Sequence, residues 1–212
     1  FWLNQTARTI LSQSTGCVTG EGCTHPPGTA FTYDSEIYVQ HLATLIGTRL
    51  RASGSSDDST LAFATRLMTQ LGLPDFYAND DLGDEVLIGG GQLVSCWDVA
   101  RLAQLVLNRG LWPTEPAAET ATRLVAESYV DQMLSPQFPS RGFSYGFLTW
   151  LNAKHAAYPH SASCCAPRWG PNETCSNHHL TRALLGDDLA DLAPSSVAMG
   201  MGRLGQYMYI VP

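Results

Sequence analysis

Lysine is almost missing from this sequence: Lys154 is the only lysine among 212 residues. Acidic residues therefore predominate, with 19 aspartates and glutamates against 12 lysines and arginines and a net charge of −7. Nucleic acids and anionic membrane surfaces attract proteins with an excess of positive charge. Neither is expected to be a partner of this chain.

Long hydrophobic runs are missing as well. None approaches the roughly 18 residues that a helix needs to cross a bilayer, so we expect no transmembrane segment. No signal peptide is recognisable. The remaining composition, 44% hydrophobic and 15% charged, is that of an ordinary globular protein. We expect one domain over residues 1–212, without internal repeats.

Six cysteines favour an oxidising compartment. Cys17 and Cys23 bracket a glycine-rich loop that is short enough to be closed by a disulfide. Cys96 falls in a predicted helix and is expected to be a small buried residue. Two Asn-x-Thr sequons, at Asn4 and Asn172, agree with secretion. An extracellular or luminal location is therefore expected.

A second group of cysteines and histidines falls in residues 153–181, which we expect to be an irregular insertion. The candidate metal ligands there are Cys164, Cys165, Cys175, His178 and His179. Their spacing fits neither a C-x-x-C site nor a paired zinc knuckle, and adjacent cysteines rarely bind one ion. We expect Cys175 to form a disulfide with one of its two neighbours, and no metal.

Hydrophobic periodicity and capping residues predict five helices and two strands. The helices are Thr6–Ser12, capped by Thr6; Asp34–Gly47; Asp58–Leu71; one that follows Gly89–Gly91, with a capping box of Ser95 and Asp98 and a stop at Gly110; and, more weakly, Pro116–Ser128. The strands are Phe143–Leu151 and Gln206–Val211. An acidic loop is expected over Asp75–Glu85.

The stretch Pro26–Gly47 is the most informative part of the chain. Its Pro-Pro-Gly-Thr sequence predicts a rigid turn. The helix that follows has one apolar face and can be capped by Asp34 or Ser35. Tyr33 would then stand at the start of a helix with its hydroxyl group facing a cleft.

Five stretches, in order along the chain, resemble serine β-lactamases, penicillin-binding proteins and their esterase-type and amidase relatives. Thr9–Gly16 (TILSQSTG) is similar to LL-x-x-TSG, and Pro27–Ser35 to the second motif of the family. Gly89–Gly110 resembles GGL-x-S-x-x-DLARF-x-x-LLLNGG, Tyr145–Leu151 resembles a Tyr-Gly-Tyr-Gly-Trp-Trp strand, and Gly202–Pro212 resembles the third-motif strand. The class C branch is the closer match.

The resemblance implies roles for two residues near Pro26–Gly47. Tyr33 matches the tyrosine that accepts the proton of the serine nucleophile. A tyrosine with an ordinary pKa near 10 needs a cation beside it for this role. Ser35 stands at the family's asparagine, and its shorter hydroxyl cannot replace an amide donor and acceptor. Ester or amide substrates are therefore expected rather than β-lactams.

The resemblance also implies a second part of the site, before the last predicted strand. Arg203 replaces the family's lysine or histidine, and its fixed charge would hold a substrate carboxylate or lower the tyrosine pKa. Gly205 would let the substrate approach, and the N–H of Gln206 would be an oxyanion donor. The same residues spell G-x-G-x-x-G from Gly200, but a strand-like segment follows, so no dinucleotide site is expected.

The family's Ser-x-x-Lys nucleophile motif does not occur in the sequence. We therefore expect an interior piece of a longer protein, inactive by itself, with an α/β (α+β) fold: an antiparallel sheet flanked by helices, plus a mostly helical lobe. The longer protein is expected to be a serine hydrolase acting on an ester, amide or peptide-like small molecule without a cofactor. The alternatives are a non-catalytic relative that binds a ligand or partner, and an interaction role unrelated to the cleft.

Overall fold

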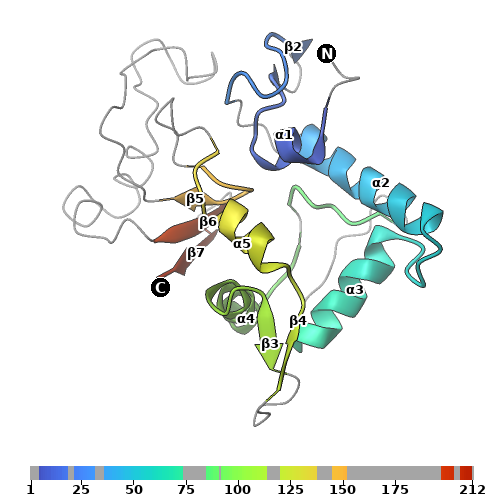
Figure 1. Ribbon diagram of the computed structural model, residues 1–212, viewed down its shortest axis with the longest axis vertical. Helices are drawn as coiled ribbons and strands as arrows, with labels where there is room; N and C mark the ends of the chain where they lie inside the picture. The colour runs from blue at the N-terminus through green and yellow to red at the C-terminus, as the bar shows by residue number, and fades with distance from the viewer. Residues whose placement is uncertain are drawn as a thin grey trace. The chain divides into compact units, whose positions relative to one another are not determined.

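The computed structural model describes residues 5–18, 22–31, 36–73, 85–90, 92–113, 120–137, 145–151, 197–202 and 206–211. The chain divides into two compact units. The first comprises Phe1–Tyr33 and Ser128–Pro212, and the second comprises Asp34–Glu127. Their helices and strands are labelled in Figure 1. Each unit is described by itself below.

The first unit begins with the short helix α1, Ala7–Leu11. The Thr6 side chain accepts a hydrogen bond from the N–H of Thr9, and the Thr9 side chain accepts one from the N–H of Thr6. This reciprocal capping box satisfies amides that the first helical turn leaves without partners. The predicted helix with Thr6 as its cap is confirmed.

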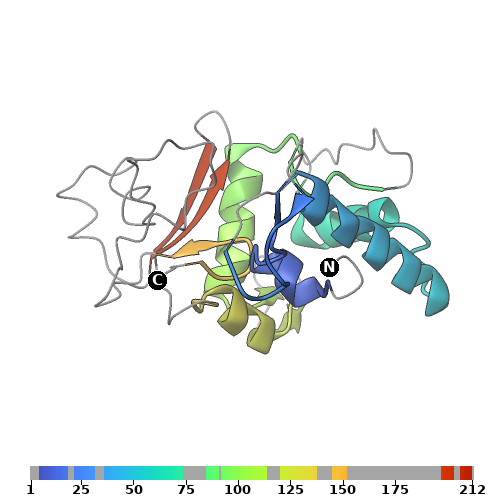
Figure 2. The same cartoon turned by 90° about the horizontal axis from the view of Figure 1, so that it is seen from above.

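Two antiparallel sheets belong to the first unit. The strands β1, Cys17–Val18, and β2, Gly22–Cys23, form a small hairpin. The second sheet has the order β5–β6–β7, with bounds Trp150–Leu151, Ala198–Gly202 and Gln206–Ile210. In Figures 1 and 2, β6 and β7 lie side by side, and their register pairs Gly202 with Gln206. The predicted strand over Gln206–Val211 is confirmed, apart from its last residue.

In the other predicted strand, Phe143–Leu151, residues 143–144 lie outside the described residues, and of the rest only Trp150–Leu151 form a strand, β5. Before them the chain turns back on itself: the N–H of Gly146 donates to the carbonyl oxygen of Thr149 over 2.8 Å. Leu148 lies in this turn with φ +49°, a left-handed conformation that a strand residue does not adopt. An aromatic sequence favours an extended backbone, but here the turn closed by Gly146 and Thr149 overrides that preference.

The predicted helix over Pro116–Ser128 is wrong for residues 120–126, and residues 116–119 lie outside the described residues; helix α5 spans Glu127–Met133. Residues Ala121–Arg123 form strand β4 instead, paired with β3, Leu111–Pro113. In this register Thr122 lies opposite Trp112. The β-branched threonine suits a paired strand, and the pairing outweighs a weak helical pattern.

Three longer helices lie in the second unit: α2, Glu36–Ala52; α3, Thr60–Leu71; and α4, Cys96–Leu107. The predicted end of α2 at Gly47 is wrong. Gly47 is buried, and a side chain there would contact Thr60, where α3 begins. These would be ordinary contacts, and helices α2 and α3 lie next to one another in Figures 1 and 2. The chain leaves α2 at Gly54, with φ +67°.

Both ends of α3 are set by local chemistry. The Ser59 side chain accepts from the N–H of Ala62, and Gly72 closes the helix with φ +66°. The predicted end at Leu71 is confirmed, and the start lies two residues after the predicted Asp58. Helices α3 and α4 share a core with Trp112 of β3 and with the residues that follow β4. Its members are Leu71, Leu73 and Leu105, with Leu67, Met68, Leu102, Trp112, Leu124 and Val125 packed against them.

Helix α4 confirms one prediction and contradicts another. Ser95 and Asp98 form the expected capping box, each side chain accepting a hydrogen bond from the other's N–H. Cys96 is exposed, with a free thiol, rather than buried as predicted. At about 100° per residue, Cys96 and the buried Leu105 point in opposite directions from the helix axis. Composition alone does not show which face of a helix is covered.

The described residues thus form a mixed helix and antiparallel-strand structure, in agreement with the coarse α+β class that was predicted. In the same ranges, no helix combines the length and the apolar character needed to cross a membrane.

The capping box of α4 predicts a specific loss of stability. Replacing Ser95→Ala removes the acceptor for the N–H of Asp98, and should lower the free energy of unfolding by about 1 kcal/mol. The control is Ser53→Ala, another serine in the same unit that caps no helix start; this change should cost less than about 0.5 kcal/mol. Urea unfolding followed by circular dichroism measures both. Equal effects would show that the capping box does not stabilise α4.

Candidate functional site

Most of the predicted site residues lie outside the described residues. These are Tyr33, Ser35, Arg203 and Gly205, together with Cys164, Cys165, Cys175 and most of the acidic loop over Asp75–Glu85. The insertion over residues 153–181 lies outside them as well. Gln206 is described as backbone and opens β7 opposite Gly202. The structure therefore describes residues that precede or follow these positions in the chain, and not the predicted site itself.

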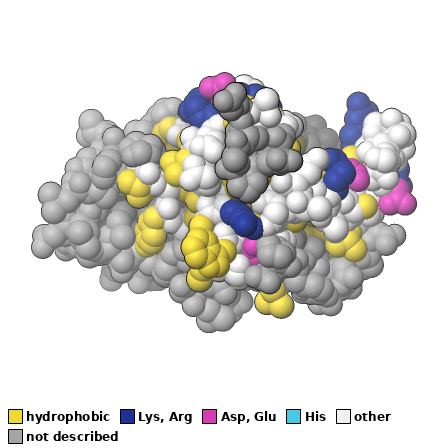
Figure 3. Space-filling model, turned by 90° about the horizontal axis from the view of Figure 1, so that it is seen from below, with side chains coloured by type: hydrophobic (Ala, Val, Ile, Leu, Met, Phe, Trp, Pro, Cys, Tyr) yellow, Lys and Arg dark blue, Asp and Glu magenta, His cyan; other side chains and the backbone are white. Residues whose placement is uncertain are grey.

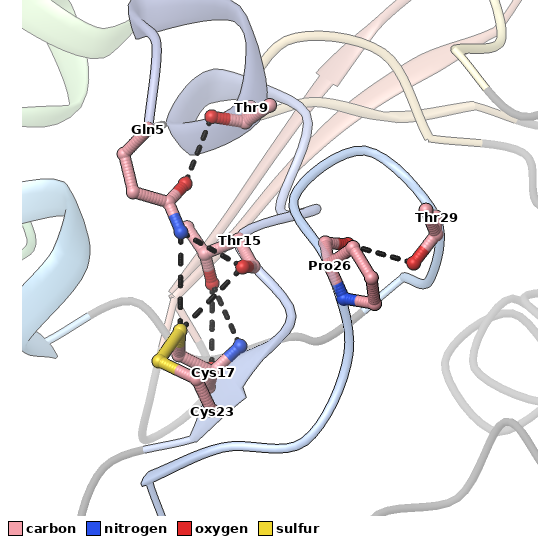
Figure 4. The surroundings of a disulfide bond; sticks show 7 residues. All are labelled: Gln5, Thr9, Thr15, Cys17, Cys23, Pro26 and Thr29. Atoms are coloured by element: carbon pink, nitrogen blue, oxygen red, sulfur yellow. Dashed lines mark hydrogen bonds between the residues drawn. A yellow bond between two sulfur atoms is a disulfide. The ribbon is translucent and has the colours of Figure 1, made fainter. Parts of the chain in front are cut away.

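The turn that leads toward Tyr33 has the predicted form. The N–H and the hydroxyl group of Thr29 both donate to the carbonyl oxygen of Pro26, at 3.2 and 2.7 Å. Figure 4 shows the Thr29 hydroxyl bond. Gly28 has φ +80°, and its N–H donates to the carbonyl oxygen of Ser14 over 2.7 Å. The proline-glycine turn is thus bonded to the segment that follows α1.

Beyond this turn, Phe31 packs edge-on against two aromatic residues of another stretch. Its ring centroid lies 5.2 Å from that of Tyr145 and 6.2 Å from that of Trp150. Trp150 lies in β5 and pairs with Met199 of β6. Strand β6 pairs in turn with β7, which begins at Gln206. Three of the stretches that resemble the hydrolase family therefore meet within the first unit. The chain is fixed at Phe31, two residues before Tyr33.

The segment after α1 is polar but buried, with Ser12, Gln13, Ser14 and Thr15 each at most 3% exposed. Such burial is tolerated because these groups find hydrogen-bond partners. The Ser12 hydroxyl donates to the carbonyl oxygen of Arg8 over 2.7 Å, and lies 2.8 Å from the Ser14 hydroxyl oxygen. These serines are structural, and their arrangement does not resemble a serine activated by an adjacent base.

Asp98 is the most deeply buried charged residue that the structure describes. It is 0% exposed; one carboxylate oxygen, Oδ2, accepts from the N–H of Ser95 over 3.2 Å. The other oxygen, Oδ1, has no hydrogen-bond partner. The positive end of the α4 dipole favours a carboxylate at this position. The sequence identified this residue through its capping pattern, and the capping bonds account for its position.

Tyr129 is the described tyrosine with a shifted pKa. Its ring lies 5.9 Å from that of Phe147, and burial raises the pKa of its hydroxyl group above the usual value. A buried phenol without a cationic partner stays protonated at neutral pH. Tyr129 therefore does not have the lowered pKa that a catalytic base requires, and Tyr33 remains the candidate.

Metal ligands do not gather in the part of the chain that the structure describes. No group of three histidine, cysteine, aspartate or glutamate side chains there could hold an ion. Asp57 is instead paired with Arg66 over 2.7 Å. Gly200 and Gly202 lie in β6, and a strand follows them, so the G-x-G-x-x-G sequence does not open a helix, as predicted.

Three glycines of the family-like stretches lie where no side chain fits. A Cβ atom at Gly16 would collide with the carbonyl oxygen of His25, one at Gly110 with that of Val125, and one at Gly146 with that of Met133. By contrast, a Cβ atom would meet nothing within 4 Å at Gly22, Gly54 or Gly90. Gly28 and Gly90 belong to family-like stretches too, and neither lies close to an opposing backbone atom, so close approach is a property of some of these glycines only.

No protein-family model matches the chain, and neither does any curated protein. The resemblance consequently depends on the five sequence stretches alone.

The close approach at Gly110 can be separated from its backbone conformation. Gly110 and Gly54 both have positive φ values, +86° and +67°, but only Gly110 faces a carbonyl oxygen. Gly54→Ala should cost about 1–2 kcal/mol, for the left-handed conformation alone. Gly110→Ala should cost a further 1–3 kcal/mol or so, because the backbone must also move. Urea unfolding of the two variants checks the difference, and equal losses would contradict the contact.

Proposed function

We propose that this chain forms part of a β-lactamase-related serine hydrolase. Such an enzyme would cleave an ester, amide or peptide-like small molecule through an acyl-enzyme intermediate, without a cofactor. The chain contains no Ser-x-x-Lys sequence, so the nucleophile would have to stand outside these 212 residues. The finer fold that this implies is a β-lactamase-like arrangement of sheet and helices.

The observation that supports the proposal best is the backbone packing at the family-like glycines. Gly16, Gly110 and Gly146 stand at glycines of the family patterns, and each lies against a carbonyl oxygen. Arg109 stands where the pattern LLLNGG has its first glycine, and its φ of +54° is a conformation that favours glycine. The requirement for glycine at these positions follows from the packing and from the backbone angles, whereas the stretches were recognised from their sequence patterns.

The proposed roles follow from the chemistry of the residues. Tyr33 would accept the proton of the serine hydroxyl as a general base. The fixed charge of Arg203 would stabilise the tyrosinate or bind a substrate carboxylate. Gly205 would leave room for the substrate, and the N–H of Gln206 would stabilise the oxyanion. With Ser35 in place of an asparagine, an ester or amide substrate is favoured over a β-lactam.

An extracellular or luminal location forms part of the proposal. The disulfide between Cys17 and Cys23 is compatible with an oxidising compartment.

The proposal is tested on the natural protein that contains this chain. It should carry Ser-x-x-Lys, be labelled by a fluorophosphonate probe and hydrolyse a p-nitrophenyl ester. Tyr33→Phe should lower kcat by about 10²–10⁴-fold, since it removes the general base. The 212-residue chain alone should not be labelled.

The control is Tyr129→Phe, which alters a tyrosine outside the proposed site and should leave kcat unchanged within about threefold. A natural protein without Ser-x-x-Lys, without labelling and without turnover would overturn the hydrolase proposal. That outcome would favour the non-catalytic relative that binds a ligand or partner.

A further inference from the structure

The hairpin of β1 and β2 is closed by a disulfide between residues directly opposite each other. Cys17 and Cys23 are partners in the register, and a bond joins their sulfur atoms. Among the described residues of this sheet, the one other pair is Val18 with Gly22. A two-stranded ladder of two pairs is at best marginally stable without a further constraint. The covalent bond therefore holds the hairpin together.

The two sulfur atoms have different surroundings. Cys17 is 0% exposed, whereas Cys23 is half-buried. The side-chain N–H of Gln5 points at the Cys17 sulfur, with 3.8 Å between the nitrogen and the sulfur, and also donates to the carbonyl oxygen of Thr15 over 2.8 Å. Figure 4 shows these contacts around the disulfide. A donor aimed at one sulfur stabilises negative charge on that sulfur when the bond breaks.

The disulfide anchors the segment that leads to the proposed base. Directly after Cys23, the N–H groups of Thr24 and His25 donate to the carbonyl oxygen of Gly16, and that of Gly28 donates to Ser14. These bonds hold residues 24–28 against the buried polar segment. Phe31 then packs against Tyr145 and Trp150. A loss of order that begins at Cys23 would therefore reach the residues just before Tyr33.

We propose that the Cys17–Cys23 disulfide is a redox switch: its reduction by a dithiol disorders residues 22–31 and thereby lowers the turnover of the hydrolase. The effect on turnover depends on the proposed function. The effect on the order of residues 22–31 does not.

The reaction is ordinary thiol–disulfide exchange. A thiolate of the dithiol attacks the more accessible sulfur, that of Cys23; the S–S bond breaks, and its electron pair leaves on Cys17, where the Gln5 N–H stabilises it. The second thiolate of the dithiol then attacks the mixed disulfide and releases Cys23. The dithiol is oxidised to a disulfide, and the two cysteines are reduced and take up two protons.

The first test measures hydrogen–deuterium exchange with and without dithiothreitol. The amides of Thr24, His25 and Gly28 should exchange at least about tenfold faster in the reduced chain, since their hydrogen bonds to Gly16 and Ser14 are lost. Amides of α3, in the other unit, should be unchanged. The double variant Cys17→Ser/Cys23→Ser should exchange like the reduced chain and not respond to dithiothreitol. Protection of residues 24–28 that survives reduction or the double substitution would overturn the switch.

A second variant tests the chemistry without removing the disulfide. Gln5→Glu keeps the side-chain length and the acceptor for Thr9 but places negative charge where Gln5 donates to sulfur. Reduction, followed by alkylation and mass spectrometry, should be about three- to tenfold slower than in the unmodified chain. An unchanged or faster rate would overturn the proposed order of attack.

Turnover of the natural protein separates the switch from the hydrolase proposal. If the oxidised protein hydrolyses the ester, reduction should lower kcat at least about tenfold. Unchanged turnover together with faster exchange would overturn the regulatory effect. If the oxidised protein has no turnover, the hydrolase proposal fails, and hydrogen exchange alone decides whether the disulfide controls the order of residues 22–31.

Discussion

Three carbonyl oxygens lie where the side chains of Gly16, Gly110 and Gly146 would begin. Each contact joins segments at least nine residues apart. Gly16 lies against His25, Gly110 against Val125 just before α5, and Gly146 against Met133 at the end of α5. Backbone can approach backbone this closely only at glycine, because any Cβ atom would displace the opposing chain. The path out of α4, the path into β5 and the path toward Tyr33 therefore depend on these glycines.

Features that depend on neighbouring residues alone could be predicted from the sequence. The caps of Thr6, Ser95 and Gly72 follow from side-chain oxygens and a glycine next to an apolar pattern. The continuation of α2 through Gly47 and the exposure of Cys96 could not be predicted, because each depends on which distant elements pack against the helix. Residues 121–123 likewise adopt a strand because β3 offers a partner. The site itself was predicted through resemblance, since its residues follow no local rule.

The buried polar groups of the first unit are used for structure. Ser12 and Ser14 bond to each other and to backbone, and burial keeps Tyr129 protonated. None of these groups is placed as an activated nucleophile or base. The roles proposed for Tyr33, Arg203, Gly205 and Gln206 therefore do not involve these buried groups. Phe31 and β5 hold the approach to that tyrosine and the β6–β7 sheet in the same unit.

Arg109 shows what the chain does where it departs from the glycine pattern. A non-glycine residue at φ +54° costs about 1–2 kcal/mol. Its side chain pairs with Glu127 over 2.8 Å, and its carbonyl oxygen accepts from Arg123 over 2.8 Å. Both partners of the ion pair are about half exposed, and such pairs contribute about 0–1 kcal/mol. The ion pair and the hydrogen bond from Arg123 both act against this strain, and the adjacent Gly110 lies against Val125 next to the paired strands β3 and β4.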